Sequence, residues 1–165
     1  MKLVEGRVTI EDVDEFVARL GAIGDEHDCT VQAFDARYIV SRTHLERALA
    51  LADRARERGE AIARERAVEI LLYAAGRRQI QQALELGVGE GDQPVVVLVA
   101  AEEGGDEHAA ADEIEPLLDA EDTLSDFDAA RVREFFEIGE RELAATDAGI
   151  EPLVRERVAL LDVEK

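Results

Sequence analysis

The sequence predicts one α/β domain (mixed α+β) over residues 1–165, in which helices pack around a small central mixed sheet. Patterns typical of strands alternate along the chain with patterns typical of helices, and helix is the more abundant of the two. A chain of 165 residues, of which 47% are hydrophobic, is long enough to bury a core without a disulfide or a metal ion. Neither an internal repeat nor a long linker divides it.

The first part of the chain predicts a strand, a helix and a second strand. Residues 2–10 have the short, mixed pattern of a first strand, and residues 29–36 alternate like a half-buried one. Residues 11–24 predict an amphipathic helix, because apolar side chains recur at helical spacing and glycines provide a stop. The apolar positions of this helix are Val13, Phe16, Val17 and Leu20.

The next helix and the central strand are predicted by local signals. A helix is expected over about 43–57, because Thr43 and Glu46 have the spacing of a capping box and Gly59 follows its end. The run VVVLVA at 95–100 is continuous and mostly β-branched. Such a run is typical of a central strand that is covered on both faces.

The C-terminal third predicts helices that are joined by acidic loops. Pro116 opens or interrupts the first of these helices, and Asp126 or Asp128 caps the next. Residues 151–163 predict an amphipathic helix that closes the chain.

The stretch EILLYAAGRRQI at 69–80 contains a glycine where a helix would favour alanine. If one helix runs over about 65–82, its core-facing stripe is Val68, Leu72, Gly76, Ile80 and Ala83. A glycine within a helix costs about 1 kcal/mol relative to alanine. Either a neighbouring backbone approaches closely at Gly76, or the helix ends near Ala75 and restarts with Gly76 as its cap. The pattern leaves both explanations open.

A second stripe of this helix combines cations with an aliphatic and an aromatic residue. It consists of Arg66, Ile70, Tyr73 and Arg77, at i, i+4, i+7 and i+11. This order suits single-stranded nucleic acid, because bases stack on tyrosine or arginine planes for about 1–3 kcal/mol while guanidinium groups hold phosphates. The alternative is a partly buried tyrosine with arginines around its rim. If the helix restarts after Gly76, free N–H groups near Arg77 and Arg78 add a second anion site.

The charge of the chain is large, negative and uneven. Aspartate and glutamate total 39 and the net charge is −20, a balance typical of a salt-loaded cytosol such as that of a salt-adapted archaeon. An acidic mimic of nucleic acid would concentrate its carboxylates, whereas here they are spread along the chain. Residues 37–82 are the exception, with ten arginines against six acids. Near molar salt the screening length is only about 3 Å, so only compact, short-range contacts would hold a polyanion there.

Because no catalytic, metal-binding or cofactor-binding pattern is found, we expect a protein that is not an enzyme and needs no metal or cofactor. His27, His44 and His108 lack a cysteine or second histidine at ligand spacing, and Cys29 lacks a matched histidine. The glycines of GVGEGD at 87–92 precede a strand rather than follow one, as in a turn. The chain has no apolar run of eighteen residues and does not begin like a signal peptide, so we expect a cytoplasmic protein.

Three motifs in the central part of the chain occur together. They are a QAFDA strand, a helix that begins with HL, and a long motif that runs from EILLY through a glycine to RQI. With these motifs the chain resembles the small kinase-associated subunit of the KEOPS complex, the Cgi/TPRKB (PRPK-binding protein) family. The resemblance covers residues 29–100, and the ends agree in element order. The matching residues are Gln32–Ala36, His44–Leu45, Glu69–Tyr73, Gly76 and Arg78–Ile80.

This resemblance implies a non-catalytic regulatory subunit of the machinery that makes threonylcarbamoyladenosine in tRNA. In that family the subunit binds a small atypical kinase, supports its ATPase activity and, in archaea, captures the single-stranded CCA end of tRNA. Other KEOPS subunits are indirect partners.

The resemblance and the second stripe together give the expected contact residues. The RNA contacts are Arg66, Ile70, Tyr73, Gly76, Arg77, Arg78 and Gln79. The kinase contacts are apolar residues of the last helix, Val154, Val158 and Leu161. The alternative is an interaction module that binds the kinase only, with the arginines as a protein interface and no RNA contact.

Overall fold

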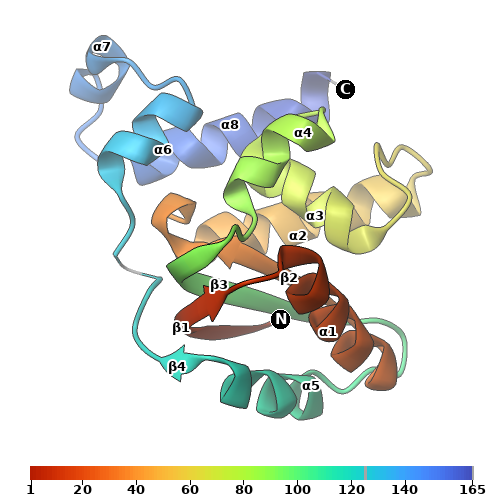
Figure 1. Ribbon diagram of the computed structural model, residues 1–165. Helices are drawn as coiled ribbons and strands as arrows, with labels where there is room; N and C mark the ends of the chain where they lie inside the picture. Colours follow the sequence, from red (N-terminus) through yellow and green to blue (C-terminus); the bar gives the residue numbers. More distant parts are fainter. Residues whose placement is uncertain (125, 165) are drawn as a thin grey trace.

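The computed structural model describes residues 1–124 and 126–164 and is built on a sheet of strand order β2-β3-β1-β4 (Figure 1). The α/β class is confirmed, but every described strand pair is antiparallel, so the expectation of a mixed sheet is wrong. The reason is that β3 lies between β1 and β2 and runs opposite to both. The strands are β1 (Lys2–Ile10), β2 (Cys29–Asp35), β3 (Gly91–Ala101) and β4 (Asp119–Ala120).

Helices cover both faces of this sheet (Figure 1). The α-helices are α1 (Val13–Glu26), α2 (Arg42–Glu57), α3 (Arg66–Ala75), α4 (Ile80–Ala83), α5 (Glu107–Ile114), α6 (Ala129–Phe135), α7 (Glu140–Ala144) and α8 (Glu151–Glu164). Single 3-10 turns are η1 (Ala36–Tyr38), η2 (Leu84–Leu86) and η3 (Glu115–Leu117). None of the helices in the described ranges is both long and apolar enough to cross a bilayer.

Strand β3 divides the apolar core into two layers. Its residues Val96, Leu98 and Ala100 pack with α2, α3, α6 and α8, whereas the alternate residues Val95, Val97 and Val99 pack with α1 and α5. All six side chains are buried. The prediction that 95–100 forms a central strand covered on both faces is therefore confirmed.

The first two helices differ from their predicted bounds, since α1 begins and ends two residues later than predicted and α2 begins one residue earlier. Helix α1 does not stop at its glycines but continues to Glu26, and Gly24 serves packing, since a Cβ there would lie 2.6 Å from the carbonyl oxygen of Cys29. Helix α2 is capped two residues before Thr43, the expected cap residue. Its cap is Ser41, whose hydroxyl accepts a hydrogen bond from the backbone N–H of His44 at 3.1 Å.

The C-terminal helices follow the expected order. Pro116 lies in η3, directly after α5, so it follows a helix rather than opening one. Of the two expected caps Asp128 is the one used, and it accepts a hydrogen bond from the backbone N–H of Arg131. Helix α8 then returns across the outer side of α2 and α3.

Gly76 ends α3 in a left-handed turn. Its φ is 61° and its ψ is 32°, and the backbone N–H of Arg77 donates to the carbonyl of Leu72 at 3.1 Å. A Cβ on Gly76 would lie 2.9 Å from the carbonyl oxygen of Arg157 in α8. Both explanations left open by the sequence therefore apply, because Gly76 caps α3 and also allows α8 to approach closely.

We predict that Gly76→Ala lowers the free energy of unfolding by about 1–2 kcal/mol more than Gly59→Ala, because it adds a backbone clash to the left-handed strain. Gly59 is the matched control, since its φ is 71° but nothing lies near an added Cβ. Urea unfolding of both variants measures the difference. Equal losses of unfolding free energy in the two variants would show that α8 does not hinder a side chain at position 76.

Candidate functional site

The stripe predicted to face outward on α3 is largely inside the protein. Ile70 and Tyr73 are fully buried. The hydroxyl of Tyr73 donates a hydrogen bond to Oδ1 of Asp162 at 2.9 Å, and Arg54 of α2 binds the other carboxylate oxygen of Asp162. The predicted outward shelf at Tyr73 is wrong, because α8 covers the side of α3 that periodicity alone left free.

Arg66 is engaged by its own protein. It forms a bidentate pair with Asp53 of α2 at 2.8 and 2.9 Å, and it donates to the carbonyl oxygens of Ala100 and Ala101 at the end of β3. The hydrogen bond to Asp53 is the main cause that raises the pKa of Arg66 above its usual value. Arg66 therefore ties α3 to α2 and to the sheet, and the expectation that it faces RNA is wrong.

Arg77 fixes the turn after Gly76. Its Nη2 donates to the carbonyl oxygen of Phe135 in α6, and its guanidinium carbon lies 4.7 Å from the centroid of the Phe135 ring. Gly76 is part of the same turn and contacts the backbone of α8. Both residues thus shape the turn, and Arg77 is only partly exposed.

Two of the predicted RNA contacts, Arg78 and Gln79, do face solvent, and they continue into an exposed apolar surface. Arg78 forms no hydrogen bond or ion pair with any described residue. Ile80 is 49% exposed and Leu84 56% exposed. We name this the α4 surface, and it consists of Arg78, Gln79, Ile80, Gln81, Gln82 and Leu84.

Ile80 and Leu84 were not among the predicted site residues. The continuous-helix pattern places both Ile80 and Ala83 on the core stripe, but the break at Gly76 changes the helix phase, so Ile80 is exposed while Ala83 and Leu86 are buried. The signal that could have identified them is the glycine itself. A helix end at Gly76 resets the phase of the residues that follow.

An apolar groove of about 410 Å³ adjoins the α4 surface. Val17 of α1 and Leu84 of η2 stand on its rim, and Leu71 of α3 lies within it. Gln32 of β2 also lines the groove, with its amide nitrogen bonded to the carbonyl of Ala33 at 2.9 Å. The groove can therefore accept a flat apolar group, with an amide inside and the Arg78 cation on the neighbouring surface.

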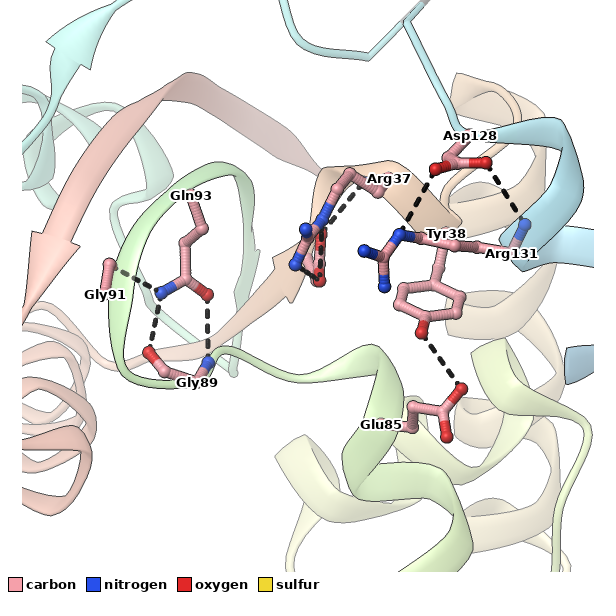
Figure 2. A network of polar contacts seen from close by, with 9 residues as sticks. Arg37, Tyr38, Glu85, Gly89, Gly91, Gln93, Asp128 and Arg131 are labelled. Atoms are coloured by element: carbon pink, nitrogen blue, oxygen red, sulfur yellow. Dashed lines mark hydrogen bonds and ion pairs between the residues drawn. The ribbon is translucent and has the colours of Figure 1, made fainter.

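Polar contacts hold the loop that forms one wall of the groove (Figure 2). The hydroxyl of Tyr38 donates to Glu85 at 3.0 Å. The side-chain amide of Gln93 accepts from the N–H of Gly89 and donates to the carbonyls of Gly89 and Gly91. Residues 87–90 thus form a fixed turn, and the last two residues of the predicted turn, Gly91 and Asp92, already belong to β3.

His44 anchors the end of α3 to α2. Its Nδ1 accepts from the N–H of Val40 at 3.3 Å, so the proton is on Nε2, which donates to the carbonyl of Ala74 at 2.8 Å. Complete burial lowers its pKa to about 4. His44 is therefore neutral near neutral pH and acts as a structural hydrogen-bonding residue.

The predicted kinase contacts are core residues. Val154, Val158 and Leu161 are buried against α2 and α3, because their spacing marks the inward side of α8. The expectation that they face a partner is wrong. The apolar residues on the outward side of α8 are Leu160, 38% exposed, and Val163, 79% exposed.

We predict that Tyr73→Ala lowers the free energy of unfolding by about 3–5 kcal/mol, as expected for a buried aromatic side chain. Tyr73→Phe keeps the ring and loses the hydroxyl contact with Asp162, so it should cost only about 1 kcal/mol. Chemical unfolding of both variants tests the assignment. A Tyr73→Ala variant as stable as the wild type would place this ring on the surface.

The comparisons with known proteins support the family that the central motifs indicate. A search of curated proteins found no match. A family model described as "Kinase binding protein CGI-121" matches residues 9–162, which includes every strand and helix from α1 to nearly the end of α8. The chain therefore belongs to the family of the kinase binding protein CGI-121.

Proposed function

We propose that this protein is a non-catalytic regulatory subunit of a KEOPS complex that binds the atypical kinase and holds the single-stranded CCA end of tRNA. Membership of the kinase-binding family supports the kinase partnership. The RNA role is supported by one observation, the exposed α4 surface, in which an unengaged Arg78 is followed by Leu84, a residue that lines an apolar groove. In this proposal the protein acts in the cytoplasm and supports the ATPase activity of the kinase.

The chemistry of an unpaired RNA end fits this surface. A base inserted into the groove would contact aliphatic side chains such as Leu71 and Leu84, and the amide of Gln32 could hydrogen-bond its edge. Arg78 would pair with a phosphate beside the groove. A paired base cannot enter such a groove without leaving its stack, so the site selects single strands.

The charge of the protein favours a compact site. Because the net charge is −20, a duplex is repelled over most of the surface, and binding depends on short contacts near the basic block of residues 37–82. In the salt-loaded cytosol that the composition indicates, counterion release contributes little affinity. Apolar contact and a paired guanidinium are weakened less by salt.

The residues best suited to catalysis have structural roles, which supports a non-catalytic subunit. His44 is buried and neutral between Val40 and Ala74. Cys29 is buried and donates to the carbonyl of His27, and burial raises the pKa of its thiol.

For the kinase we propose the outward side of α8 as the contact. Its inward side is fixed by Val154, Val158 and the Tyr73–Asp162 hydrogen bond, so the helix is a firm platform. Leu160 and Val163 supply exposed apolar area on the other side. Leu160 lines a pocket together with Gly76 and Arg77, so this face borders the turn that precedes the α4 surface, and Val163 is the residue chosen to test kinase binding.

We predict that tRNA with an intact CCA end binds more tightly than tRNA without it, and that Arg78→Glu and Leu84→Glu each weaken binding roughly tenfold. Arg47→Glu is the matched control, because Arg47 is also exposed and unengaged among the described residues but lies on α2. Fluorescence anisotropy in high salt measures the affinities. Equal binding of both tRNAs would remove the RNA role.

We predict that Val163→Glu weakens copurification with the kinase at least tenfold while leaving tRNA affinity unchanged, since an exposed apolar contact is replaced by a charge. Leu84→Glu is the reciprocal control and should leave kinase binding unchanged. The second candidate function, a module that binds the kinase only, is favoured if Leu84→Glu abolishes kinase binding and the wild type does not distinguish the two tRNAs.

A further inference from the structure

Three metal-ligating side chains meet on the α1–α5 side of the sheet, away from the α4 surface. Glu26 is the last residue of α1, His27 follows it as the cap residue, and Glu113 lies in the last turn of α5. One ligand atom from each lies within 4.8 Å of the other two. Glu113 is 86 residues from His27 in the sequence, so only the fold brings these groups together.

The backbone around His27 is fixed before any ligand binds. Its carbonyl accepts from the N–H of Asp106 at 2.9 Å, and the carbonyl of Asp28 accepts from the N–H of Glu102 at 2.8 Å. Gly105 is pressed against the same segment, since a Cβ there would lie 2.1 Å from the carbonyl oxygen of Asp28. The loop that leads into α5 is therefore joined to the end of α1, and this fixes the distance between His27 and Glu113.

We propose that Glu26, His27 and Glu113 bind a divalent transition-metal ion, with Zn²⁺ as the representative ion. An imidazole nitrogen with two carboxylates is a donor set that zinc accepts, and water completes its coordination. Metal–ligand distances of about 2.0–2.1 Å in a tetrahedral site separate the donor atoms by about 3.4 Å.

The geometry of the pair needs little change to reach these distances. Nε2 of His27 lies 3.0 Å from Oε1 of Glu113, in a hydrogen bond that the ion would replace. Glu26 is exposed, so its side chain can turn toward the pair. Glu113 raises the pKa of His27 through this hydrogen bond, and the same negative field favours a metal cation at Nε2.

Such an ion would link two helices that otherwise meet through apolar side chains. The α1–α5 layer uses Leu20 and Ile23 from α1 and Ala110 and Ala111 from α5. A metal bridge between their ends would stabilise this layer by binding the folded state alone. Sequence spacing does not reveal the site, because Glu113 lies 86 residues from His27 in the chain.

The test is a Zn²⁺ titration of metal-stripped full-length protein by isothermal calorimetry at about pH 7.5. The wild type should bind one ion, and His27→Gln and Glu113→Gln should each lower the affinity at least tenfold. His108→Gln is the matched control, because His108 forms an exposed pair with Asp112 at 3.5 Å, without the third ligand. It should leave the affinity unchanged.

Imidazole NMR signals of the wild type provide a second readout that does not depend on a variant folding. The chain has three histidines, so the ring signals of His27 can be followed separately from those of His44 and His108. Zinc should shift the His27 signals at the lowest concentrations, whereas Mg²⁺ should not. Equal zinc affinity in the His27→Gln and His108→Gln variants, or no selective shift of His27, would overturn the proposal.

Discussion

The close approach of α8 to the left-handed turn at Gly76 determines which residues of the central motif lie inside the protein. At this point the backbone of Arg157 lies where any larger residue would place its Cβ, so α8 can lie directly on α3. Tyr73 is enclosed by that contact and bonded to Asp162. Beyond the turn the chain changes direction, and Arg78, Ile80 and Leu84 are presented to solvent. Gly76 thus separates the buried helix α3 from the exposed residues that follow it.

The arginines of the basic block are divided in the same way. Arg66 holds α3 to Asp53 and to the end of β3, and Arg77 holds the turn to Phe135. The Arg66 guanidinium pairs with a carboxylate, and both guanidinium groups donate to backbone carbonyls, so each of these side chains has a structural partner within the protein. Arg78 is the member of the predicted set that stays free among the described residues, so charge alone does not identify a binding arginine. Arg78 belongs to the α4 surface, in which Leu84 lines an apolar groove, and this supports its proposed role.

Local signals in the sequence predicted most of the fold. Three of these signals depend only on neighbours along the chain: the β-branched run at 95–100, the apolar periodicity of α1 and the cap at Asp128. Each of them lies in the strand or helix that it predicts. Gly24 was misjudged as a stop and the sheet as mixed, because close approach and strand order depend on distant segments. For the site, helical periodicity gave the stripe of Ile70 and Tyr73 correctly. It could not show that α8 lies over that stripe, nor that Val154, Val158 and Leu161 form the matching inner face.

Hydrogen–deuterium exchange of the whole protein, with and without tRNA carrying an intact CCA end, tests most directly whether the surface after Gly76 is the binding surface. The account predicts slower exchange at 78–88 and at 13–20, the segments on the two sides of the groove, with α3 already protected in the free protein. Slower exchange confined to the exposed side of α2, with residues 78–88 unchanged, would contradict it.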